Sequence, residues 1–255
     1  MMMMMMMMKL PIRTRPVLRG AASCLSRHSS SSSLSTPLPR YTSLSSATAS
    51  DFSLQDAAFE EVAKSQADRV LALLRAETGG TFLHELDLLE HSLQSASRAY
   101  RDGADEELVV VALLHDIGEV LCPGNHGEVA AGLLRPYIRA ENHWLLLHHE
   151  VYQAHYYADA MNTRSSETGG DNAAMIDPDL RDRFKDHPCH AHTVAFCEKY
   201  DQVSFDPDYE SLPLEFFEPM VRRIFAREPW THTGEQQEPA IAKAELAAAY
   251  PSGTA

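Results

Sequence analysis

The sequence has few of the features that mark membrane, disulfide-bonded or nucleotide-binding proteins. No run of about 18 apolar residues occurs in the chain, which disfavours a membrane-spanning helix. Cys24 lies in the first fifty residues, and Cys122, Cys189 and Cys197 form no CxxC pair, so neither a disulfide framework nor a zinc finger is indicated. No glycine-rich phosphate loop and no internal repeat is present. These absences favour a soluble protein in a reducing compartment.

Acidic residues are missing from the first fifty positions. No Asp or Glu precedes Asp51, whereas six basic residues do: Lys9, Arg13, Arg15, Arg19, Arg27 and Arg40. An Arg-rich, Ser-rich and acid-free segment is typical of an organelle transit peptide, and the early arginines favour the mitochondrion over the plastid. A disordered tail behind the methionine run of residues 1–8, on a cytoplasmic protein, is the alternative. We therefore assign residues 1–50 to a transit peptide or a disordered segment and leave them out of the fold.

The rest of the chain is strongly acidic. Subtracting the six early basic residues from 22 leaves 16 Lys and Arg against 36 Asp and Glu, a net charge of −20 with histidine neutral. Such a charge disfavours nucleic-acid phosphates and anionic membranes as partners. We expect a small-molecule substrate instead.

A sustained alternation of apolar and polar residues is also missing, so no convincing strand is predicted. Apolar residues recur instead at spacings of three and four, which is typical of helices. We predict an all-α domain over residues 53–228, with a mobile loop at 161–177 that could act as a lid, and a C-terminal tail at 229–255 holding a loose helix at 239–249. The expected helices are 54–77, 86–100, 106–119, 126–134, 140–157, 191–205 and 214–226.

The segment 106–119, EELVVVALLHDIGE, is the predicted centre of this domain. Residues 108–114 are apolar on every side, which indicates a fully buried helix, and Asp105 is a suitable N-cap. Its last turn carries His115 and Asp116. An isolated charge in the interior costs several kcal/mol, so these side chains must be neutralised, hydrogen-bonded or bound to metal.

Imidazoles and carboxylates are the ligands that iron, manganese and similar divalent ions prefer. A single histidine on a helix is more often a hydrogen-bonded or surface residue, so the combination carries the prediction. Asp116 could bridge two ions, and His148 is the alternative to its neighbour His149. The six candidate ligands, each on or beside an expected helix, are His91, His115, Asp116, His126, His149 and Asp201.

The order of His91, the His115-Asp116 pair and Asp201 resembles the H, HD, D pattern of the HD-domain metal-dependent superfamily, over nearly all of residues 79–228. The resemblance implies a helical bundle around a metal site. His126 and His149 resemble the two additional histidines of the dinuclear members. His149 is preferred over His148 because the run HEVYQAH that it begins is similar to the corresponding segment of inositol oxygenase.

Three stretches resemble the organophosphonate-dioxygenase-like branch, which is related to myo-inositol oxygenase: LLEHSLQSA (88–96), GADEELVVVALLHDIG (103–118) and NHGEVAAGLLRPY (125–137). Those enzymes activate oxygen at a mixed-valent di-iron centre. The resemblance implies an oxygenase with two iron ions that uses O2 to cleave a small hydroxylated substrate. One alternative is a phosphohydrolase that acts on phosphomonoesters or nucleotides with Mn²⁺ or another divalent ion. A metal-binding module without turnover is the second alternative.

The sequence departs from the phosphonate enzymes at their substrate-binding positions. Thr81 and His84 stand where that branch has a tyrosine and a glutamate. Glu119 replaces a histidine, Gln153 a lysine and Glu198 an arginine. Because the cationic residues are lost, a dianionic substrate is disfavoured.

A less anionic hydroxylated molecule fits these replacements better, unless Lys199, Arg164, Arg181 or Lys185 compensates for the lost charge. We assign catalytic roles to Asp116 and Glu119. A solvated glutamate at a helix end is the alternative reading of Glu119. The substrate-binding candidates are His84, Glu119, Gln153 and Lys199.

Overall fold

The computed structural model describes residues 39–79, 86–167 and 176–229, which fall into two compact units divided at residue 66. The N-terminal unit contains a short 3-10 helix, η2 (Leu44–Ser46), and the exposed helix α2 (Ala49–Lys64). Thr48 and Asp51 cap α2 reciprocally, because each side chain accepts a hydrogen bond from the other residue's backbone N–H.

The helix predicted over residues 54–77 is wrong as a single element, because the chain forms two helices there. α2 ends at Lys64 and α3 (Gln66–Ala76) follows it. Ser65 interrupts the pattern, and its hydroxyl donates to the Val62 carbonyl at 3.0 Å. Serine competes in this way with the regular backbone ladder and therefore favours helix ends over helix interiors.

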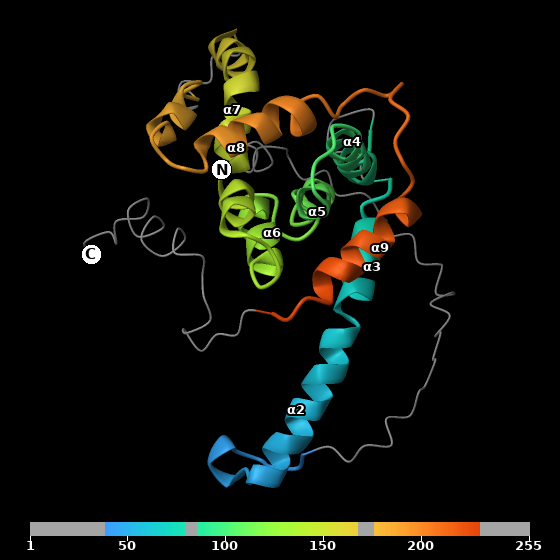
Figure 1. Cartoon of the computed structure of the whole chain (residues 1–255). Coiled ribbons are helices and arrows are strands. Elements are labelled where there is room, and N and C mark those ends of the chain that lie inside the picture. The colour runs from blue at the N-terminus through green and yellow to red at the C-terminus, as the bar shows by residue number, and fades with distance from the viewer. Residues whose placement is uncertain (1–38, 80–85, 168–175, 230–255) are drawn as a thin grey trace, which may run out of the picture. The chain divides into compact units, whose positions relative to one another are not determined.

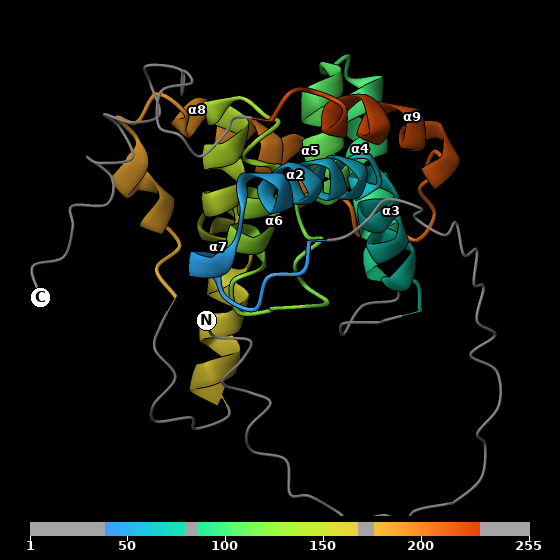
Figure 2. The same cartoon turned by 90° about the horizontal axis from the view of Figure 1, so that it is seen from below.

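The described residues of the second unit form helices joined by turns and loops and contain no strand, so the predicted all-α class is confirmed. Figures 1 and 2 both show α5 between α4 on one side and α6 with α7 on the other. α9 lies beside α3, joined to it by the Arg222–Asp68 ion pair. After α3 the elements are α4 (Leu88–Arg101), α5 (Glu106–Leu114), α6 (His126–Leu134), α7 (Ala140–Glu167), η3 (Leu180–Phe184), α8 (His190–Phe196), η4 (Cys197–Asp201) and α9 (Leu214–Phe225).

Helix α5 forms the centre of the hydrophobic core, as predicted. Every residue from Val109 to Leu114 is at most 1% exposed. Asp105 caps the helix by accepting a hydrogen bond from the Leu108 backbone N–H at 2.9 Å. The helix is shorter than predicted, because it ends at Leu114 with His115 as its C-cap. His115 and Asp116 therefore lie in the turns that follow α5 and not in its last turn.

Two later elements also differ from prediction. α7 runs to Glu167, through the start of the loop predicted at 161–177, and Asn162 pairs with the Ile176 backbone through two hydrogen bonds of 2.8 Å. The helix predicted over 191–205 is α8 followed by η4, a π-helical turn. Residues 168–175 of the loop and the helix predicted at 239–249 lie outside the described residues. No helix in the described ranges is long and apolar enough to cross a membrane.

Candidate metal centre

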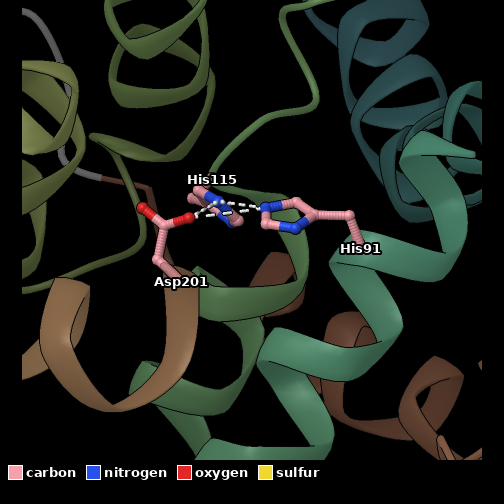
Figure 3. A group of neighbouring side chains, drawn as sticks. All are labelled: His91, His115 and Asp201. Atoms are coloured by element: carbon pink, nitrogen blue, oxygen red, sulfur yellow. Dashed lines mark hydrogen bonds and ion pairs between the residues drawn. The ribbon is translucent and has the colours of Figure 1, made fainter. Parts of the chain in front are cut away.

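Four side chains from three helical segments converge on a first metal position. The Nε2 atoms of His91 on α4 and His115 at the end of α5 lie 3.2 Å apart. Each of these nitrogens lies 3.4 Å from Asp201 Oδ1 and 3.3 Å from Asp116 Oδ2. Figure 3 shows the two rings and the Asp201 carboxylate pointing toward one another from α4, α5 and η4. The structure thus brings together four of the six predicted ligands at one point.

A second metal position lies on the other side of Asp116. The Nε2 atoms of His126, the first residue of α6, and His149 on α7 lie 3.1 Å apart. Both nitrogens lie 3.2 Å from Asp116 Oδ1. Because Oδ1 contacts this pair and Oδ2 contacts the first pair, the Asp116 carboxylate has the arrangement of a bridging ligand.

The rings are held so that their Nε2 lone pairs converge. The Nδ1 atoms of His91, His115 and His149 each lie 2.9 Å from a backbone carbonyl oxygen, of Ser204, Ala112 and Leu146 respectively. A carbonyl accepts but does not donate, so each Nδ1 bears the hydrogen and each neutral ring presents a bare Nε2. Fixing the far nitrogen in this way is how proteins orient metal-binding histidines.

The spacing and chemistry of these atoms fit divalent metal ions. Two ligands each about 2.1 Å from one ion are about 3.0 Å apart at a right angle and about 3.4 Å apart at the tetrahedral angle. The ligand atoms of both positions are separated by 3.1–3.4 Å, within this range. A mixed set of imidazole nitrogens and carboxylate oxygens suits iron, manganese and zinc.

Two glycines permit the close packing that brings the ligands together. A Cβ on Gly118 would lie 2.5 Å from the His126 carbonyl oxygen, so only glycine lets the turn after α5 approach the start of α6. A Cβ on Gly127 would lie 2.6 Å from the Leu146 oxygen and 3.0 Å from His149 Cε1. α6 can therefore pack against α7 beside His149 only if residue 127 has no side chain.

The π-helical turn η4 supplies the last ligand. It ends at Asp201, and the Gln202 backbone N–H donates to the Cys197 carbonyl at 3.0 Å, five residues earlier. Such turns are rare and occur often at functional sites. Asp201 is 1% exposed, and its Oδ2 has no hydrogen-bond partner within the part of the chain that the structure describes.

Without a metal ion, protons bridge the same atoms. Burial opposes the charged form of His91, but hydrogen bonds to Asp116 and Asp201 outweigh it and raise the pKa of His91 to about 9. Burial likewise opposes the charged form of His126, but the Asp116 carboxylate outweighs it and raises the pKa of His126 to about 9. The histidines hold the pKa of Asp116 and that of Asp201 below the usual range despite burial. The cluster thus holds positive charge under either condition, as protons or as metal.

The adjacent histidines His148 and His149 have different surroundings in the structure. His149 faces Asp116 and His126. His148 instead stacks on Trp144, with ring centroids 3.7 Å apart, and its Nδ1 lies 2.9 Å from the Trp144 carbonyl oxygen. Burial lowers the pKa of His148 to about 4, so this ring is neutral and belongs to the aromatic packing of α7.

The Glu119 side chain contacts His126 on the ring nitrogen opposite the one that faces Asp116. Its Oε1 lies 3.1 Å from His126 Nδ1, while its buried Oε2 has no hydrogen-bond partner among the described residues. A carboxylate in this place helps to orient the ring, together with the Pro123 carbonyl oxygen, which lies 3.4 Å from the same Nδ1. The structure therefore gives Glu119 a positioning role toward His126, and the catalytic role remains a prediction.

The structure gives less support to the other three predicted substrate-binding residues than to Glu119. Gln153 is half-buried on α7, one turn after His149. The Lys199 ammonium lies 3.0 Å from Asp102 in an exposed ion pair, away from the ligand atoms. His84 lies outside the described residues. Substrate binding by these three residues remains a prediction.

Sequence reasoning missed two carboxylates. Glu150 accepts a hydrogen bond from the Gly127 backbone N–H at 3.2 Å and lies 3.5 Å from His126 Nδ1. Its place directly after His149 is the signal that could have pointed to it. Glu77, at the end of α3, is 2% exposed, and no motif in the sequence marks it.

The comparison with known families agrees with this geometry. The HD domain family model matches residues 88–184, so this segment is similar to an HD domain, in agreement with the predicted resemblance. HD domains bind divalent metal ions. The matched segment includes five of the six candidate ligands, and Asp201 lies beyond its end. No curated protein matches the chain. The match does not separate the oxygenase branch from the hydrolases.

Proposed function

We propose that the protein is a di-iron oxygenase that uses O2 to cleave a small hydroxylated substrate. The observation that carries the proposal is the second histidine pair: His126 and His149 face Oδ1 of the same carboxylate whose Oδ2 faces His91 and His115. A single-metal site does not need this second pair. The sequence resemblance to the oxygenase branch supports iron over other divalent ions.

In this proposal each ligand has a defined task. His91, His115 and Asp201 hold one ion, His126 and His149 hold the other, and Asp116 binds both. Bound iron would supply Lewis acidity and one-electron chemistry toward oxygen. The chain's own contribution is to orient the ligands and to exclude water.

Apolar rings and one free carboxylate oxygen surround the ligands. Phe205 stacks on His91 with ring centroids 4.5 Å apart, and Phe196 packs edge-on against His115 at 5.5 Å. These rings shield the first metal position from solvent. Glu119 Oε2 is a free acceptor for a substrate hydroxyl, and burial raises the pKa of this carboxyl group.

The charges around the centre favour an uncharged or weakly anionic substrate. Within the described residues no lysine or arginine pairs with Asp116, Asp201, Glu119 or Glu150. Of the cations that were expected to compensate, Lys199 is paired with Asp102, and Arg181 lies over the Tyr156 ring at 5.8 Å. A dianionic phosphonate would meet carboxylates without a matching cation.

Metal content and oxygen uptake test the proposal. Protein purified with iron and partly reduced should give the EPR signal of a mixed-valent di-iron pair. It should also consume O2 with a member of a panel of hydroxylated acids, polyols and phosphonates. One firmly bound metal ion per chain without that EPR signal would contradict the proposal.

A metal-dependent phosphohydrolase is the second candidate, and the HD domain match favours it because hydrolytic chemistry is common among HD domains. The same ligands would lower the pKa of a bound water that attacks phosphorus. Robust hydrolysis of phosphomonoesters or nucleotides by the Mn²⁺- or Co²⁺-loaded protein, abolished by Asp116→Ala, would favour this activity over the oxygenase.

A further inference from the structure

Glu77 is a buried carboxylate without a partner. It follows the last turn of α3, where its backbone N–H donates to the Leu74 carbonyl at 3.0 Å. The residue is 2% exposed, and both of its carboxylate oxygens lack a hydrogen-bond partner within the described part of the chain. An ionised carboxylate in this situation is costly unless a cation or donor compensates for the lost hydration.

The charged groups that act on Glu77 are those of the metal centre. Its electrostatic neighbours include Asp116, His115 and His91, together with Asp87 at the start of α4. No lysine or arginine is among these neighbours. Three of the four are candidate ligands of the first metal position, so the Glu77 carboxyl group lies within electrostatic reach of that position. Burial raises the pKa of Glu77 to about 8 in the metal-free protein.

Glu107 is a buried glutamate whose carboxylate is fully paired with donors from the chain, and it serves as a comparison for Glu77. It is 4% exposed, and its carboxylate accepts hydrogen bonds from the Arg139 backbone N–H at 2.7 Å, from Asn142 Nδ2 at 2.9 Å and from the Arg227 guanidinium. Glu77 has the same burial and none of these donors. Among the described residues, Glu77 therefore has no donor or cation of the kind that holds Glu107.

We propose that Glu77 is a further carboxylate of the metal centre. It places a negative charge beside the ion held by His91, His115, Asp116 and Asp201, and it accepts a hydrogen bond from the water or hydroxyl group bound to that ion. Two divalent ions carry four positive charges, of which Asp116 and Asp201 neutralise two. A third carboxylate reduces the remaining positive charge from two to one, and the ion in turn offsets the cost of burying the Glu77 carboxylate.

The inference rests on the metal centre and not on the reaction that the centre performs. It is tested with Glu77→Gln, which keeps the shape of the side chain and removes its charge. The dissociation constant for Mn²⁺, measured from the EPR signal of the free ion, should rise at least tenfold. The thermal midpoint of the metal-free variant should stay unchanged or rise, because the amide cannot ionise, whereas burial opposes the ionisation of the Glu77 carboxyl group.

Glu107→Gln is the matched control, since it makes the same substitution at an equally buried glutamate. It should lower the thermal midpoint of the metal-free protein and leave the Mn²⁺ dissociation constant unchanged. Glu77→Asp, which keeps the charge on a shorter side chain, should recover part of the affinity lost in Glu77→Gln. This recovery separates an effect of charge from an effect of packing.

Three results would overturn the inference. Wild-type Mn²⁺ affinity in Glu77→Gln would remove Glu77 from the centre, as would a lower midpoint with unchanged affinity, the behaviour expected of Glu107→Gln. A wild-type protein that binds no Mn²⁺ would overturn the metal centre and the inference together. If Glu77→Gln weakens Mn²⁺ binding but the iron-loaded protein gives no mixed-valent signal, the role of Glu77 stands and only the proposed oxygenase fails.

Discussion

The acidic residues at the two ends of helix α5 pair with different kinds of cation. At the N-terminal end, Asp105 lies 2.7 Å from Arg139 Nη1, Glu106 pairs with Arg223, and Glu107 pairs with Arg227. Beyond the C-terminal end, every ion pair that Asp116 makes within the described residues is with a histidine.

From this difference we expect the acidic residues at the start of α5 to stabilise the fold, and Asp116 after its end to serve the proposed metal centre. The arginines at the N-terminal end are permanent cations of the chain, so they neutralise their partners without any ligand. The imidazoles beyond the C-terminal end are cations only while protonated, and in the proposed metal centre they would give up protons on binding metal ions. Substitutions at the two ends should therefore affect different measurements.

The largest effect is expected from Asp116→Ala. Loss of the bridging carboxylate should reduce bound metal from two ions per chain to one or fewer and lower any metal-dependent activity by about a thousandfold or more. The thermal midpoint of the metal-free protein should change far less. Metal analysis, activity and calorimetry on the same preparation check this, and a variant that keeps two ions would contradict the bridging role.

The opposite result is expected from Glu107→Ala at the other end. Arg227, Asn142 Nδ2 and the Arg139 backbone N–H would lose their shared acceptor. Breaking a buried charged network costs about 3 kcal/mol, although the exposure of both arginines reduces their part. Denaturant unfolding should show this loss while the metal dissociation constant stays unchanged. A metal-binding defect as large as that of Asp116→Ala would show that the two ends are not independent.

A smaller effect on the metal side is expected from Gly127→Ala. The added Cβ would meet the Leu146 carbonyl oxygen at 2.6 Å and His149 Cε1 at 3.0 Å. The backbone has to shift, which displaces His149 and should weaken metal binding about tenfold. Gly132→Ala, on the same helix with open space around the added atom, is the control that should bind metal normally. Equal affinities in the two variants would contradict the role of the close approach.

The sequence predicted the parts of this arrangement that depend on local rules. The apolar run of α5 and its Asp105 cap are readable because burial on every side and an acidic N-cap leave a direct pattern in the chain. The ligand set was found through a family motif whose spacing places His91, His115 and Asp116 together. These features need no knowledge of which helices touch.

Features that depend on tertiary contacts could not be predicted. Glu77 stands out only because the folded chain buries its carboxylate without a partner among the described residues, and an isolated glutamate near a helix end gives no signal of that. The π-helical turn that ends at Asp201 and the ion pair between Glu119 and His126 are likewise results of packing between segments. The end of α5 at Leu114 was missed because the apolar pattern continues to Ile117.

A change of pH should affect the stability of the metal-free protein and the strength of metal binding in opposite directions. The pKa values of His91 and His126, raised to about 9 from an unfolded value near 6.5, stabilise the metal-free protein fully below about pH 6.5. That contribution is lost as the pH rises through about 9. Metal binding requires deprotonated imidazoles and strengthens over the same range. The midpoint gained on adding Mn²⁺ should therefore grow from pH 6.5 to 9. A constant gain would mean that protons and metal do not compete for these rings.

The smallest effect is expected from Arg223→Met at the N-terminal end. The guanidinium makes a forked contact with Glu106, with Nε 3.0 Å from each carboxylate oxygen and Nη2 2.6 Å from Oε2, but both side chains are solvent-exposed. Exposed pairs contribute little and are screened by salt. The midpoint should fall by about 2 °C or less at low salt. The difference should vanish at high salt, and metal affinity should not change. A large loss that does not depend on salt would mean that the exposed pair stabilises α5 as strongly as the buried Glu107 network does. The position at this end of the helix, and not burial, would then decide how much an ion pair contributes to stability.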